Sequence, residues 1–143
     1  MTTRVRIAMV GFGRIARTEH RPAIDASDHF DLVAVVDPVT AAASVPCFKN
    51  LESLLDSGPS FDAVALCQPP QARFDAARLA LRAGLDVLLE KPPGATVAEV
   101  ESLTSLARSG GRTLFAAWHS RFSPGLPQAI AWLASRRVRS VSI

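Results

Sequence analysis

The chain has 143 residues, enough for one domain with a hydrophobic core, and its 48% hydrophobic and 20% charged content is typical of a globular, soluble protein. The net charge of +3 comes from scattered basic residues, nearly all arginines, and aromatic residues make up only 6%, so we expect no nucleic-acid partner. No apolar run has the length of a membrane helix and no signal peptide is recognisable, so we expect a cytoplasmic protein without a membrane segment. The two cysteines lack metal-ligand spacing, and we expect no metal site.

Hydrophobic periodicity and turn signals predict strands that alternate with helices. In chain order, the patterns predict a strand at Val5–Val10, a helix at Gly13–Ala26, a strand at Asp31–Val36, a helix at Asn50–Ser57, a strand at Asp62–Cys67, a helix at Gln71–Ala83, a strand at Asp86–Leu89, a helix at Thr96–Ser109, a strand at Thr113–Trp118, a helix at Pro124–Ser135 and a strand from Val138 to Ile143. Asn50 and the T-V-A-E run from Thr96 are typical helix starts, and Pro22 is expected to kink or break the first helix.

Repeated strand–helix units with short links predict an α/β protein of the Rossmann type, with a doubly wound parallel sheet. Such sheets bind their ligands outside the carboxyl ends of the strands. The candidate functional motifs all fall at such ends, and they are Gly11–Ala16, Asp37, Gln68–Pro70, Glu90–Pro93 and His119. We therefore expect one ligand site along this edge.

The first strand runs into the turn Gly-Phe-Gly-Arg-Ile-Ala, a Gly-x-Gly-x-x-Ala pattern that predicts a dinucleotide-binding turn. Gly11 permits the tight turn and Gly13 the close approach of a pyrophosphate. Asp37 ends the next strand and is expected to accept hydrogen bonds from the adenosine ribose, which favours NAD over NADP. Lys49 is too distant along the chain to count as a ligand of a 2′-phosphate. An ordinary strand–helix turn and an S-adenosylmethionine site are the alternatives.

A second motif, Glu-Lys-Pro-Pro, ends the strand at Asp86–Leu89. Its lysine, Lys91, is one of only two in an arginine-rich chain, and a lysine there can orient a substrate hydroxyl or relay a proton. Glu90 is expected to pair with a cation or with the nicotinamide group, and His119 to hydrogen-bond a substrate hydroxyl. The alternatives are a surface lysine and a structural histidine. Trp118 is expected in the core, and His20 receives no role.

The segments GFGRIA, VVDP, CQPP, LEKPPGAT and WHSRFSP together resemble the N-terminal domain of the Gfo/Idh/MocA oxidoreductase family, and most of all its aldose 1-dehydrogenases. The resemblance implies NAD(P)-dependent oxidation of a sugar such as L-arabinose or D-galactose at the anomeric carbon to a lactone. It implies a catalytic, substrate-contacting Lys91 and a sugar contact from His119. It also implies cofactor contacts from Gly11, Phe12, Gly13, Arg14 and Ile15, and from the loop Gln68, Pro69 and Pro70.

The resemblance also predicts the domain organisation. Residues 1–120 would form the dinucleotide-binding domain, and residues 121–143 would form a connecting helix and the start of a second, sheet-rich α+β domain that is missing from this chain. Because that domain carries the general base in the family, we expect these residues alone to be inactive, and the protein to be a homo-oligomer. Some relatives have a small or basic residue in place of Asp37, so NADP stays possible. A non-catalytic NAD-binding sensor or interaction module is the alternative function.

Overall fold

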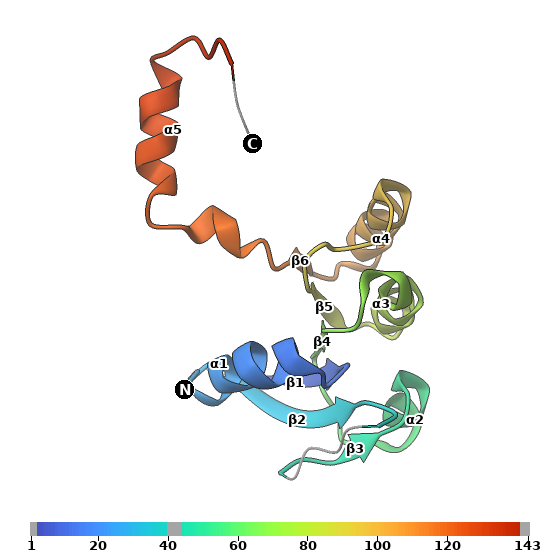
Figure 1. Ribbon diagram of the computed structural model, residues 1–143. Helices are drawn as coiled ribbons and strands as arrows, with labels where there is room; N and C mark the ends of the chain where they lie inside the picture. The colour runs from blue at the N-terminus through green and yellow to red at the C-terminus, as the bar shows by residue number, and fades with distance from the viewer. Residues whose placement is uncertain (1–2, 40–43, 141–143) are drawn as a thin grey trace.

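Six parallel strands form a single sheet in the computed structural model, which describes residues 3–39 and 44–140 (Figure 1). The strands are β1 (Val5–Val10), β2 (Phe30–Val36), β3 (Cys47–Phe48), β4 (Ala63–Leu66), β5 (Asp86–Leu89) and β6 (Leu114–Ala116). Their order across the sheet is β3-β2-β1-β4-β5-β6, and every neighbouring pair is parallel. This is the doubly wound order of the Rossmann fold, with its switch point between β1 and β4, so the predicted fold class is confirmed.

Helices cover both faces of the sheet, as the right-handed crossover rule requires. The helical elements are the π-helical turn η1 (Ala16–His20), α1 (Arg21–Asp25), α2 (Leu51–Ser57), the 3₁₀ turn η2 (Pro70–Ala72), α3 (Arg73–Arg82), α4 (Val97–Gly110), the 3₁₀ turn η3 (His119–Phe122) and α5 (Leu126–Ala134). Figure 1 shows α2, α3 and α4 on one side of the sheet and α1 on the other. Both predicted helix starts are confirmed, because Asn50 caps α2 and Thr96 forms a capping box with Glu99.

The larger part of the core lies under α2, α3 and α4. Alternate strand residues such as Val10, Val64 and Leu66 point to this face, where they meet buried leucines and alanines of the three helices. The core on the opposite face is smaller. There, Met9 and Phe12 pack with Ala16 of the helix that follows β1. Phe12 of the glycine turn is thus packed against this face of the sheet.

The first helix does not break at the predicted position. Its hydrogen bonding changes to the π pattern over η1, where the Arg21 N–H donates to the Ala16 oxygen, and the helix continues into α1. Pro22 is the second residue of α1, directly after the π-helical turn. The widened turn thus accommodates the proline without ending the helix, and His20 is its last residue.

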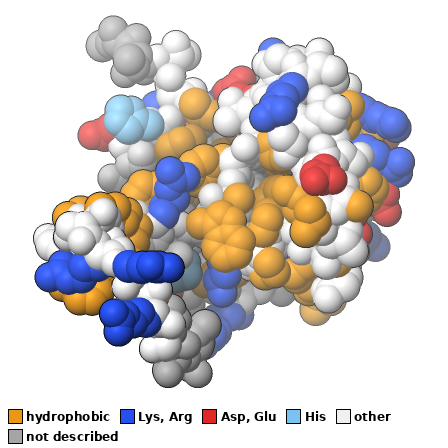
Figure 2. Space-filling model, turned by 90° about the horizontal axis from the view of Figure 1, so that it is seen from above, with side chains coloured by type: hydrophobic (Ala, Val, Ile, Leu, Met, Phe, Trp, Pro, Cys, Tyr) orange, Lys and Arg blue, Asp and Glu red, His pale blue; other side chains and the backbone are white. Residues whose placement is uncertain are grey.

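The part of the chain from β6 onward departs most from the sequence prediction. β6 ends at Ala116, so His119 lies in η3 instead of directly after a strand, and Trp118 is 48% exposed instead of buried. The α5 helix projects away from the sheet (Figure 1), and hydrophobic and basic side chains lie together on this projecting part at the lower left of Figure 2. Residues 138–140 form no strand, because the chain there has left the sheet, while residues 141–143 lie outside the described residues.

None of the helices in the described ranges combines the length and the apolar character needed to cross a membrane.

Candidate functional site

The glycine turn after β1 fits closely against the loop that follows β4. Gly11 has a φ of +84°, a region that side-chain-bearing residues rarely adopt, and its N–H donates to the Val36 oxygen at 2.8 Å. A Cβ at this position would lie 2.9 Å from the Gln68 nitrogen and 3.2 Å from the Cys67 carbonyl carbon. Glycine is therefore required at position 11 for two independent reasons, its backbone conformation and the space available.

Open space lies in front of the helix start. A Cβ at Gly13 would meet nothing within 4 Å, and both Gly13 and Arg14 are exposed. The helix begins directly afterwards, with Ile15 half-buried and Phe12 buried behind the turn. Unpaired N–H groups at a helix start favour an anion, so this space has the chemistry of a pyrophosphate site.

The Asp37 carboxylate is held at the end of β2, beside the turn. Its Oδ2 accepts a hydrogen bond from the Phe12 N–H at 2.8 Å, and its Oδ1 accepts one from the Val39 N–H at 2.9 Å. The structure thus brings Asp37 to the glycine turn, as its place in the sequence pattern predicts. Its own N–H donates to the Phe48 oxygen at 2.9 Å, so Lys49 follows a residue that contacts Asp37. Lys49 therefore lies near Asp37 despite its distance along the chain, and its exclusion as a ligand of a 2′-phosphate stays a prediction.

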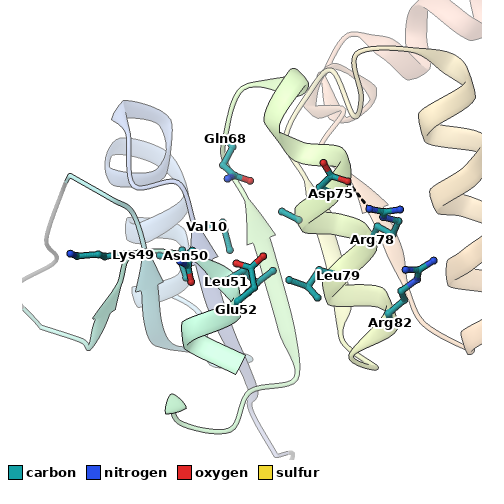
Figure 3. A pocket seen from close by; sticks show the side chains of 12 residues that line it. Val10, Lys49, Asn50, Leu51, Glu52, Gln68, Asp75, Arg78, Leu79 and Arg82 are labelled. Carbon is teal, nitrogen blue, oxygen red and sulfur yellow. Dashed lines mark hydrogen bonds and ion pairs between the residues drawn. The ribbon is translucent and has the colours of Figure 1, made fainter. Parts of the chain in front are cut away.

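A cavity of about 550 Å³ begins at the carboxyl ends of β1 and β2 and extends between α2 and α3 (Figure 3). Val10, Val36 and Gln68 line its end beside the turn. The Oε1 atom of Gln68 is buried and has no hydrogen-bond partner among the described residues. A buried amide oxygen without a partner is costly, so a donor from a ligand would satisfy it. This cavity has the position and the chemistry to receive the adenosine half of a dinucleotide.

A buried arginine joins the loops after β4 and β5. The side chain of Arg73, at the start of α3, is only 3% exposed among the residues described. Its guanidinium donates to the backbone oxygens of Gln68, Glu90 and Pro92. Burial lowers the pKa of Arg73, and the Glu90 carboxylate acts against that shift. The five N–H groups of a guanidinium, held in a fixed geometry, suit this task. With them, Arg73 provides hydrogen-bond donors for three backbone carbonyl groups in two loops at the edge of the sheet.

The Cys67 thiol lies at the end of β4, in the same region. Burial, followed by the nearby Glu90 charge, raises the pKa of this thiol to about 12. The thiol is therefore protonated at neutral pH, and its low thiolate fraction makes it less reactive than an exposed thiol.

We expect the two cysteines to differ in alkylation. At about pH 8, iodoacetamide should modify the exposed Cys47 and leave Cys67 unmodified in the folded chain, while both should react in urea. The pKa of Cys67 in the folded chain lies above that of an unfolded thiol. The protonated thiol therefore contributes to the free energy of unfolding below about pH 9, and this contribution is lost as the pH rises toward about 12. Peptide mass spectrometry measures the labelling. Equal labelling of both thiols in the folded chain would contradict this assignment.

On the other side of the glycine turn, a cavity of about 590 Å³ brings together Ile15, His20, Glu90, Lys91 and His119. The His20 Nε2 atom lies 2.9 Å from Glu90 Oε1, and the Glu90 Oε2 accepts the Lys91 N–H at 3.0 Å. Lys91 and His119 are exposed on the cavity wall, and the Lys91–Pro92 peptide is cis. The two predicted substrate residues therefore border one cavity with a residue of the glycine turn.

Sequence reasoning missed two residues of this site. The sequence pattern places Arg73 inside a predicted helix without a further role, and it gives His20 no role. Both act through partners far along the chain, since 17 residues separate Arg73 from Glu90 and 70 separate His20 from Glu90. No local pattern signals such pairs. Of the predicted residues in the loop after β4, Gln68 lines the cavity of about 550 Å³, Pro69 is exposed and Pro70 begins η2.

Residues 5–118 match the Gfo/Idh/MocA oxidoreductase family, which is described as having an NAD-binding Rossmann fold. The chain belongs to the Gfo/Idh/MocA family. A galactose 1-dehydrogenase of Pseudomonas fluorescens is 37% identical over 139 residues, which are 97% of this chain and 45% of that protein. The chain thus spans about half the length of the relatives it matches.

Solved structures agree with this family membership. The crystal structure of a D-galactose-1-dehydrogenase from Rhizobium etli is 45% identical, with a TM-score of 0.90 over 98% of this chain and 45% of that one. The WlbA dehydrogenase from Bordetella pertussis, solved in complex with NADH and UDP-GlcNAcA, is 25% identical, with a TM-score of 0.84 over 92% of this chain and 42% of that one.

Proposed function

We propose that this chain is the cofactor-binding domain of an aldose 1-dehydrogenase, which oxidises a sugar such as D-galactose or L-arabinose at its anomeric carbon to a lactone. The observation that carries this proposal is that Ile15 of the glycine turn and Lys91 border one cavity, although the first follows β1 and the second follows β5. Cofactor and substrate groups therefore meet at one place. The similarity to two galactose 1-dehydrogenases supports the sugar class.

The chain's residues divide the binding of a dinucleotide between two sides of the turn. We propose that Gly13 and the helix start hold the pyrophosphate, with Asp37 facing the ribose hydroxyls and Gln68 facing the adenosine. A carboxylate repels a 2′-phosphate, so we propose NAD in preference to NADP. Arg14 and the loop Pro69–Pro70 are proposed to line the same groove, beside the buried Phe12.

The second cavity supplies the groups that meet the sugar. Bound NAD supplies a hydride acceptor there. The Lys91 amine orients the hydroxyl of the anomeric carbon and favours its ionised form, because a positive charge nearby lowers the pKa of a hydroxyl. His119 hydrogen-bonds another sugar hydroxyl, and Glu90 fixes the lysine segment beside the nicotinamide. Residues 121–143 are proposed to lead toward a second domain, which agrees with α5 having no buried residue.

Isothermal calorimetry tests the cofactor half of the proposal. We expect the chain to bind NAD, to bind NADP at least about tenfold more weakly, and to release no heat with S-adenosylmethionine. Gly13→Ala should weaken NAD binding by about tenfold or more, because a methyl group would occupy the space kept for the pyrophosphate. Its melting temperature should be unchanged, since the added Cβ meets nothing within 4 Å. Preferred binding of S-adenosylmethionine would contradict the dehydrogenase assignment.

A further inference from the structure

We propose that His20 is a positioning residue for Lys91, acting through the side chain of Glu90. This inference rests on the proposed function, because it concerns how the lysine meets bound cofactor and substrate. It adds a role for a histidine that lies in the π-helical turn η1, outside both sequence motifs.

The contacts on the Glu90 carboxylate carry the inference. One oxygen, Oε1, lies 2.9 Å from His20 Nε2, and the other, Oε2, accepts the backbone N–H of Lys91 at 3.0 Å. The side chains of His20 and Glu90 are only 16% and 13% exposed. Both carboxylate oxygens are thus engaged in a shielded place, where hydrogen bonds are stronger than in water.

The backbone on either side of Lys91 is held from the opposite direction. The Arg73 guanidinium donates to the oxygens of Glu90 and Pro92, the residues before and after the lysine. The lysine main chain is therefore held between a histidine of η1 and an arginine of α3. An exposed lysine loses much conformational entropy when it meets a ligand, so fixing its backbone in advance lowers that cost.

The histidine also joins the cofactor turn to the lysine loop. His20 follows the glycine turn on the same helix, and Glu90 follows β5. The contact between His20 and Glu90 would therefore keep the Lys91 segment at a fixed place relative to the turn where NAD would bind. Without that contact, NAD would still bind through the turn, but the Lys91 segment would be tied to α3 alone, through Arg73.

Amine labelling allows a direct test. Trace labelling with acetic anhydride, read by peptide mass spectrometry, gives the reactivity of Lys91 with and without NAD, relative to a lysine-containing peptide added to the same solution as a reference. At saturating NAD, we expect Lys91 to be protected about tenfold in the wild-type chain, and His20→Ala to lose most of this protection, as expected for one lost hydrogen bond to a carboxylate. His20→Gln should restore it, because its amide also reaches Glu90. His29→Ala, at an exposed histidine, is the matched control and should behave as wild type.

Calorimetry and circular dichroism separate the possible failures. If NAD binds and His20→Ala keeps full protection of Lys91, the positioning role is wrong. If the wild-type chain itself binds no NAD, the proposed function fails instead. Glu90→Leu provides a second route should His20→Ala not fold, since it removes the same link from the other side. When both variants fold, His20→Ala and Glu90→Leu combined in one chain should reduce the protection of Lys91 no more than either change alone. Additive losses of protection would overturn the inference.

Discussion

Arg73→Met is expected to lower the free energy of unfolding by about 3 to 5 kcal/mol, the largest single effect on stability that we predict for this chain. Methionine fills a similar volume but donates no hydrogen bond. The backbone oxygens of Gln68, Glu90 and Pro92 would then lose their guanidinium partner at a place where the arginine is 3% exposed. Each buried carbonyl left without a partner costs about 1 to 3 kcal/mol, although water entering the gap recovers part of that.

Urea denaturation followed by circular dichroism measures this change. Arg78→Met is the matched control, because Arg78 lies on the same helix and is exposed, with a surface ion pair to Asp75 at 2.9 Å and its guanidinium over the Phe74 ring. We expect the control to change the unfolding free energy by no more than about 0.5 kcal/mol. Arg73→Lys should fall between the two, since an ammonium reaches fewer carbonyls than a guanidinium. Equal effects at positions 73 and 78 would show that the arginine does not tie the two loops together.

Gly11→Ala is expected to destabilise the chain by about 3 kcal/mol, while Gly84→Ala costs only about 1 to 2 kcal/mol. Both glycines have positive φ, +84° and +79°, so both substitutions introduce the same backbone strain. Only at Gly11 does the new Cβ also meet backbone atoms, with the Gln68 nitrogen at 2.9 Å, whereas nothing lies within 4 Å at Gly84. The difference between the two variants therefore measures how tightly the turn fits against the loop after β4.

Thermal unfolding of the two variants side by side gives this difference. Because Gln68 lines the cavity that we propose for the adenosine, Gly11→Ala should also weaken NAD binding, and Gly84→Ala should leave it unchanged. Identical melting temperatures would mean that the loop moves away from the added methyl at little cost.

The sequence predicted what local chemistry determines. The apolar run of β1, the glycine turn and the cap at Thr96 each depend on residues within a few positions, and all three are present as expected. The place of Asp37 beside the turn followed from the strand order, which alternating strands and helices already imply. For the same reason, the strand-end position of Lys91 was predictable, since β5 is an ordinary buried strand.

What the sequence did not predict depends on contacts between distant segments. β3 is only two residues long and exists because it pairs with the end of β2, so periodicity does not reveal it. The contacts of Arg73 and His20 join elements whose spacing only the folded chain defines. The strand predicted from Val138 requires a neighbour to pair with, and the projecting α5 takes the chain away from the sheet.

The two cavities beside the glycine turn have no lining residue in common. Residues from α2 and α3 form the first, whereas η1 and the segments after β5 and β6 form the second. If the first cavity receives the nucleotide and the second the sugar, as we propose, amino-acid changes that alter nucleotide preference are separate from those that alter sugar preference. A lineage can exchange one preference while it keeps the other, provided that Gly11 and Arg73, which tie the loops to the shared edge of the sheet, are retained.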